Sequence, residues 1–141
     1  MNRAQKIAWL VIITITAALL LTGISVGILY AISGFPAAAA GMGFLGITGF
    51  CGLGPVIFKK EQGVVDCDER DILINRKAAN IGFLTAFLIV GLSCMLPFFI
   101  LGPKHTISVT WLPMIFAAAG LSSIYTHSLA IIVQYGKGEK S

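Results

Sequence analysis

The sequence predicts an all-α integral membrane protein with four transmembrane helices, and three observations support this: its composition, its long uncharged stretches and its distribution of positive charge. Of its 141 residues, 57% are hydrophobic and 11% are charged, and the mean hydropathy is +0.91. A soluble domain carries about 25% charged residues, so this chain has too few to cover a water-facing surface. Its apolar side chains must therefore face lipid.

Four long stretches contain no charged residue, at positions 7–32, 37–58, 78–101 and 110–135. Each exceeds the roughly 20 residues that an α-helix needs to cross about 30 Å of hydrocarbon. Because lipid offers the backbone no hydrogen-bond partners, each stretch must be helical. The chain is therefore expected to form a single four-span membrane domain over residues 1–141.

The first span, 7–32, follows Arg3 and Lys6, a basic start that signal peptides share. Its apolar run is far longer than the roughly 7–15 residues of a signal-peptide core, so we interpret it as a retained signal-anchor. Only a short link separates it from the second span, with Pro36 near the start of the new helix. So short a link predicts an antiparallel hairpin.

The second span, 37–58, is rich in glycine, at positions 41, 43, 46, 49, 52 and 54. Small residues allow helix backbones to approach one another closely, which drives association in lipid. We interpret this span as a central helix that is contacted on several sides, and as a possible route to a homo-oligomer. The alternative is a hinge or pore-lining helix that glycine has softened.

The third span, 78–101, ends at Gly102-Pro103, and a short link leads to the fourth span, 110–135. This arrangement predicts a second antiparallel hairpin. Aromatic residues that favour membrane interfaces lie near the predicted span ends, namely Trp9, Tyr30, Trp111 and Tyr135.

Positive charge is distributed unevenly about the spans. Nine of the ten Lys and Arg residues lie at the two termini or in the loop 59–77, and Lys104 alone lies on the other side. By the positive-inside rule, both termini and this loop are cytoplasmic, and the protein is a multi-pass protein of the inner or plasma membrane. Anionic lipid headgroups account for the net charge of +4, so the bilayer is the expected partner and nucleic acid is not.

The loop 59–77 carries four carboxylates in six positions, ahead of Arg76 and Lys77. Acidic residues at the start of a helix and basic residues further along it interact favourably with the helix dipole. We therefore interpret the acidic residues as the capped start of a helix that runs into the third span. Alternatively, the loop docks a partner protein. A divalent-cation site is a further possibility, although the spacing fits no calcium loop. The candidate docking residues are Asp66, Asp68, Glu69, Arg70 and Asp71.

The stretch DERDILINRKAANIGF, residues 68–83, resembles the cytoplasmic loop of a family of small prokaryotic multi-span membrane proteins of unknown function. The matching positions are Asp68, Glu69, Arg70, Lys77 and Ala78. The resemblance covers the loop and the start of the third span. It implies an architecture and a compartment, but no reaction.

None of the four spans contains Asp, Glu, Lys or Arg. A proton-coupled exporter needs such a charge in the membrane, and a quinone-linked disulfide oxidase needs paired cysteines, so both interpretations are disfavoured. Cys51, Cys67 and Cys94 follow no disulfide framework. We expect no enzymatic activity, no cofactor and no metal.

One intramembrane polar site is a candidate, formed by Cys51 of the second span with Ser123, Thr126 and His127 of the fourth. Ser123 and His127 share a helix face because they lie four residues apart. We interpret His127 as a neutral histidine that is hydrogen-bonded within a helix contact. The alternative is a soft-metal or proton site made of Cys51 and His127.

Two functional hypotheses follow. The first is a non-enzymatic membrane protein that acts by contact, as a small accessory or regulatory subunit. The second is an oligomeric transporter or channel-like protein for a small solute, in which the polar stretch of the fourth span faces the glycines of the second. A cation sensor that uses the acidic loop is a third and weaker hypothesis.

Overall fold

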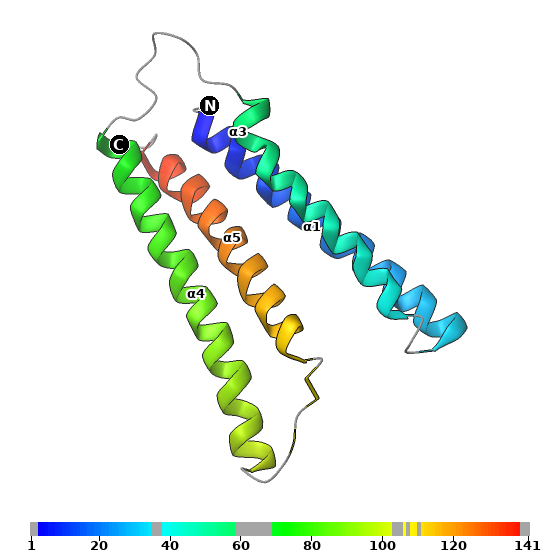
Figure 1. Ribbon diagram of the computed structural model, residues 1–141. Helices are drawn as coiled ribbons and strands as arrows, with labels where there is room; N and C mark the ends of the chain where they lie inside the picture. Colours follow the sequence, from blue (N-terminus) through cyan, green and yellow to red (C-terminus); the bar gives the residue numbers. More distant parts are fainter. Residues whose placement is uncertain are drawn as a thin grey trace. The chain divides into compact units, whose positions relative to one another are not determined.

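The computed structural model describes residues 3–34, 38–58, 69–102, 106, 108–109 and 111–138, and this part of the chain is helical and contains no strand (Figure 1). Four helical segments are long and apolar enough to cross a membrane. The predicted all-α class and the four candidate spans are therefore confirmed. In chain order the elements are α1 (Arg3–Ser33), the 3₁₀-helix η1 (Ala39–Leu53), α3 (Gly54–Ile57), α4 (Glu69–Leu101) and α5 (Trp111–Gly138).

The chain forms two compact units, Met1–Asp66 and Cys67–Ser141. The first unit contains α1, η1 and α3, which pack against one another, and the second contains α4 and α5. In each unit the first helix ends at a glycine with positive φ, Gly34 at 77° and Gly102 at 79°. The amide N–H of each glycine donates to the carbonyl four residues earlier, which stops the helix as left-handed glycines commonly do.

In the first unit, η1 and α3 run along α1 in the opposite direction. A methyl group at Gly41 would lie 2.8 Å from the backbone nitrogen of Val26, and one at Gly54 would lie 3.0 Å from the side chain of Ile7. Glycine therefore allows a backbone approach at Gly41 that no other residue permits. On α1 the buried residues follow a helical repeat along one face, namely Ala8, Val11, Ile15 and Ala18.

The 3₁₀ form of η1 is the main difference from the expected fold, because the sequence predicted a helix here but not its type. η1 is 15 residues long, whereas 3₁₀ segments of more than three or four residues are uncommon. A 3₁₀-helix rises about 2.0 Å per residue and an α-helix about 1.5 Å, so η1 covers a given length of α1 with fewer residues. The 13 residue steps from Gly41 to Gly54 cover about 26 Å along the axis of η1. The residues that they contact on α1, Val26 and Ile7, are 19 α-helical steps apart, which cover a similar length of about 28 Å.

In the second unit, α4 begins at Glu69 and continues without a break to Leu101. This agrees with the prediction of a helix that passes from the acidic loop into the third span. Asp66 and Asp68, the expected capping residues, lie outside the described residues. α5 packs along α4 in the opposite direction, since residue 71 contacts residue 135 and residue 75 contacts residue 127.

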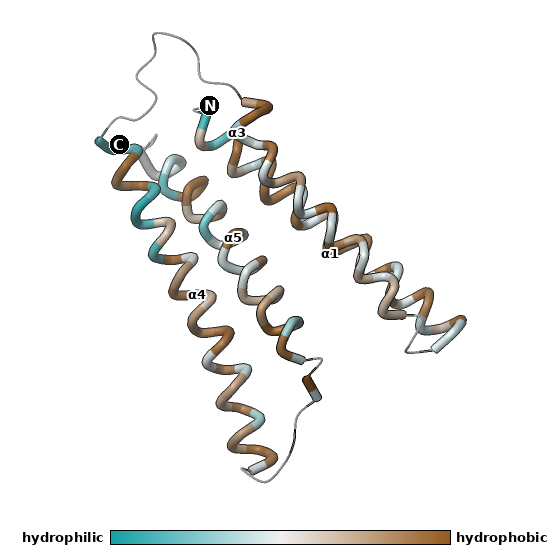
Figure 2. Tube along the Cα trace, viewed as in Figure 1, coloured by the Kyte–Doolittle hydropathy of each residue, from teal (hydrophilic) through white to brown (hydrophobic). Residues whose placement is uncertain are grey.

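The buried contact between α4 and α5 contains small residues together with Ile74 and Ile131, while most of the large apolar side chains are exposed. Ala78 and Gly82 are buried, whereas Phe83, Phe99 and Phe116 are 73%, 76% and 82% exposed. Figure 2 shows hydrophobic residues along most of both helices and hydrophilic ones gathered where α4 begins. Small residues inside and large apolar ones outside suit helices that are surrounded by lipid.

Candidate functional site

Polar side chains bridge α4 and α5 near the start of α4. The hydroxyl of Tyr135 donates a hydrogen bond to Oδ1 of Asp71. One turn further along α4, Nε2 of His127 lies 3.1 Å from Oδ1 of Asn75, which accepts a hydrogen bond when that nitrogen carries the proton. We call these four residues the polar seam.

The helical repeat of each helix explains why these side chains meet. Asp71, Asn75, Ala78 and Gly82 follow one another at intervals of four, three and four residues, so they lie on one face of α4. On α5, His127 and Tyr135 are eight residues apart and also share a face. The two faces pack together, and the seam occupies their polar end.

Gly82 sets how closely the two helices approach below the seam. A methyl group there would lie 2.8 Å from the carbonyl oxygen of Ser123 and 3.2 Å from Cβ of His127. The prediction that Ser123 and His127 share a helix face is confirmed, because both border this glycine. Their contact with glycines of the second span stays a prediction; the glycine that they border in their own unit belongs to α4.

Thr126 uses its hydroxyl within its own helix. Its Oγ1 donates to the carbonyl of Ser122 at 2.8 Å and also lies 3.2 Å from the carbonyl oxygen of Ser123. Threonine in helices commonly bonds back to the preceding turn in this way. The hydroxyl of Thr126 therefore belongs to the local structure of α5 rather than to the seam.

Cys51, the fourth predicted member of the intramembrane site, lies in the first unit. Its thiol donates weakly to the carbonyl of Val11, with 4.0 Å between sulfur and oxygen. Because Cys51 and His127 belong to different units, a joint metal or proton site stays a prediction. Among the described residues, no three or more His, Cys, Asp or Glu side chains gather to hold a metal ion, and Cys51 and Cys94 are free thiols.

The described members of the candidate docking set divide into two kinds. Glu69 and Arg70 are exposed in the first turn of α4. Asp71 is half-buried and bonds Tyr135 across the helix pair. The exposed charges at the proposed docking surface are therefore those of Glu69 and Arg70, whereas the carboxylate of Asp71 also joins α4 to α5 within the unit.

Sequence reasoning missed Asn75 and Gly82, and it treated Tyr135 only as an interface anchor. The regular spacing of Asp71, Asn75, Ala78 and Gly82 was the available signal, since it marks one polar and small face on an otherwise apolar helix. No pattern in the sequence indicates which residue of α5 lies opposite each member of that face.

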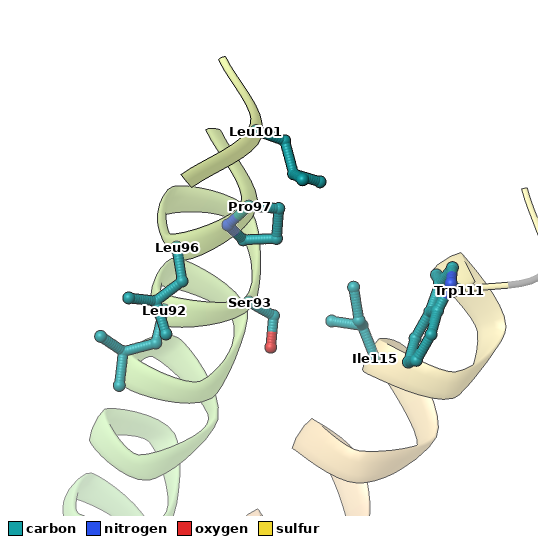
Figure 3. Close-up of a pocket in the computed structure, with 7 residues that line it drawn as sticks. All are labelled: Leu92, Ser93, Leu96, Pro97, Leu101, Trp111 and Ile115. Atoms are coloured by element: carbon teal, nitrogen blue, oxygen red, sulfur yellow. The ribbon is translucent and has the colours of Figure 1, made fainter. Parts of the chain in front are cut away.

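At the other end of the pair, α4 and α5 enclose an apolar cleft. Its volume is about 480 Å³, and it is lined by Leu92, Ser93, Leu96, Pro97, Leu101, Trp111 and Ile115. Figure 3 shows Ser93 and Pro97 directed from α4 toward α5. Because Pro97 has no backbone N–H, the carbonyl of Ser93 loses the donor that a regular helix would supply. Ser93 therefore lines this cleft with its side chain, and its carbonyl lacks the usual intrahelical donor.

No family model, curated protein or solved structure in the comparisons made with this chain matches it. The resemblance to small prokaryotic multi-span membrane proteins therefore stays a prediction. The role of the polar seam is therefore inferred from the chemistry of its four side chains. In the described structure it pairs a carboxylate with a phenol and a histidine with an amide, which suits hydrogen bonding between helices rather than a nucleophile with its base.

Proposed function

We propose that this chain is a multi-pass protein of the inner or plasma membrane that acts by contact, as a small accessory or regulatory subunit rather than as an enzyme. In this proposal its four spans cross the bilayer as two antiparallel hairpins, with both termini and the loop 59–77 in the cytoplasm. Hydropathy supports the insertion, and the uneven distribution of Lys and Arg supports the orientation.

A row of glycines on η1 is the observation that carries the contact function. A 3₁₀-helix has 3.0 residues per turn, so Gly43, Gly46, Gly49 and Gly52 fall in one line. All four are exposed, and a methyl group at any of them would meet no atom within 4 Å. We call these residues the glycine row. It resembles the small-residue surfaces on which transmembrane helices associate.

The polar side chains of α5 already form hydrogen bonds within the second unit, and this also favours a contact function over transport. A transporter would offer the hydroxyls and the histidine of the fourth span to a solute. Instead, the hydroxyl of Thr126 bonds its own helix and the ring of His127 bonds Asn75. These groups therefore already have partners that a solute would have to displace.

In this proposal the glycine row binds a second copy of the chain, and the charges at the start of α4 face a partner protein. Large apolar side chains flank the row, with Phe44 43% and Phe50 60% exposed on one side and Met42 37% exposed on the other. Such a surface, with a smooth backbone strip between bulky side chains, suits close packing against another apolar helix. Glu69 and Arg70 extend beyond the apolar part of α4 and remain accessible from the cytoplasm.

The test measures the number of chains per particle in lipid nanodiscs prepared directly from native membranes. Gly46→Leu fills the middle of the glycine row and is expected to shift the protein to single chains, while Gly46→Ala shifts it partly. Gly23→Leu is the matched control, because Gly23 also has open space around it but lies on α1. The control should leave the assembly unchanged. A wild-type protein that is monomeric and carries no companion protein would overturn the proposal.

A further inference from the structure

The first unit carries a second surface feature, a shallow groove at the start of α1. It has a volume of about 450 Å³ and lies apart from the glycine row. We call it the Lys6 groove, and it is lined by Lys6, Trp9, Leu10, Ile13, Thr14 and Phe58.

One end of the groove is positively charged. Lys6 is exposed, and its ammonium forms no ion pair with any residue that the structure describes. Arg3, one turn earlier, donates from Nε to the carbonyl of Phe58 at 2.6 Å and from a terminal nitrogen to that of Pro55 at 3.4 Å. Arg3 thus holds Phe58, one wall of the groove, in place.

The floor of the groove is apolar and runs along α1. Residues at positions 6, 9, 10 and 13 share one helix face, so the floor extends about 10 Å along the helix axis from Lys6 to Ile13. Trp9 is 46% exposed and Ile13 is 62% exposed. Tryptophan at this position suits the level of the lipid headgroups, with the apolar floor leading deeper into the bilayer.

We propose that the Lys6 groove binds an anionic phospholipid of the cytoplasmic leaflet. The phosphate lies at Lys6, and one acyl chain lies along Trp9 and Ile13 against Phe58. A cation beside an apolar channel is complementary to a molecule that carries both an anion and a hydrocarbon chain. The cytoplasmic leaflet is rich in such lipids. This inference rests on the proposed membrane orientation, but not on the proposed contact function.

Quenching of Trp9 fluorescence by brominated lipids tests the proposal in the full-length chain. The protein has two tryptophans, so Trp111→Phe leaves Trp9 as the only reporter. In phosphatidylcholine vesicles, a small fraction of chain-brominated phosphatidylglycerol should quench Trp9 more strongly than the same fraction of chain-brominated phosphatidylcholine. Equal quenching by the two lipids would overturn the proposal.

Charge variants show whether the selectivity belongs to the groove. Lys6→Gln should lower the preference for the anionic lipid about fivefold, because one lysine near an anionic surface contributes about 1 kcal/mol. Lys77→Gln is the matched control, since it removes the same charge from exposed Lys77 on α4, and it should keep the preference. A loss of equal size in the control would mean that only general attraction acts, and would contradict the proposal.

Two further measurements separate lipid binding from misfolding and from the binding of free phosphate. Lys6→Arg keeps the charge and should keep the preference, which distinguishes a lost binding site from a misfolded variant. Soluble glycerol phosphate at millimolar concentration should not restore Trp9 fluorescence. If it does, the phosphate contact alone carries the binding and the acyl chain contributes nothing, which would contradict the proposed lipid site. The Gly46→Leu variant should retain the lipid preference, so the groove and the contact function can fail independently.

Discussion

The two helix pairs reach close packing by different means. In the first unit, Gly41 lets η1 approach the backbone of Val26, and Arg3 at the helix ends and, weakly, Cys51 donate to backbone carbonyls across the pair. In the second unit, Gly82 allows a similar approach, but the polar seam adds two specific bonds between helices. The second pair is therefore held in one register, whereas the first pair leaves a second face of glycines open.

This difference separates two classes among the described glycines of the helices. Gly41 and Gly82 touch a neighbouring backbone, whereas the glycine row and Gly91 have open space around them. Glycines of the first class are required for the fold of each unit. Those of the second class leave open surface, and we assign the contact function to the first unit because four of them line up there in the glycine row.

The largest effect is expected at a glycine of the first class. Gly82→Leu places a side chain against the carbonyl of Ser123 and forces α4 and α5 apart. Overpacking of this kind costs about 1–3 kcal/mol, and the broken seam adds to it. The free energy of unfolding, measured by denaturant titration in mixed micelles, should fall by that amount.

Gly91→Leu is the control for this comparison, because Gly91 is on the same helix and meets no atom within 4 Å. Its effect should stay within about 0.5 kcal/mol. If the two variants are equally stable, the division of the glycines into two classes is wrong. The same experiment on Gly41 and Gly43 would extend the test to the first unit.

The fold was more predictable than the site because long uncharged apolar stretches can be recognised directly in the sequence. Four apolar stretches of sufficient length required four helices, and these are present. Hydropathy does not distinguish a 3₁₀-helix from an α-helix, so the form of η1 was missed. The spacing of three between Gly43, Gly46, Gly49 and Gly52 was compatible with either form.

The partners within the seam could not be predicted for a different reason. Sequence reasoning identified His127 and its neighbour Ser123, and the spacing on α4 marks one polar and small face, but no pattern shows which residue of α5 lies opposite each member of that face. The bond between Asp71 and Tyr135 joins residues 64 positions apart. Such a pair depends on the register of two helices, which the sequence does not state directly.

A smaller effect is expected from the charged bond of the seam. Asp71→Ala and Tyr135→Phe each remove one partner of a hydrogen bond to a carboxylate, and such bonds contribute about 1.5–3 kcal/mol. Because Asp71 is only half-buried, we expect about 1.5 kcal/mol for each variant. A double-mutant cycle on the free energy of unfolding should show that the two losses are not additive. Additive losses would mean that the residues do not interact in the membrane.

The smallest effect is expected from the neutral bond between His127 and Asn75. Hydrogen bonds between membrane helices contribute about 0.6 kcal/mol on average, so His127→Ala and Asn75→Ala should each cost about that much and the double variant little more. Under the metal or proton hypothesis, His127→Ala would also change the metal content or the pH response, whereas Asn75→Ala would change neither. A packing role predicts the same small loss in both variants with metal content and pH response unchanged. The pair of variants therefore separates a histidine that holds two helices together from one that binds a ligand.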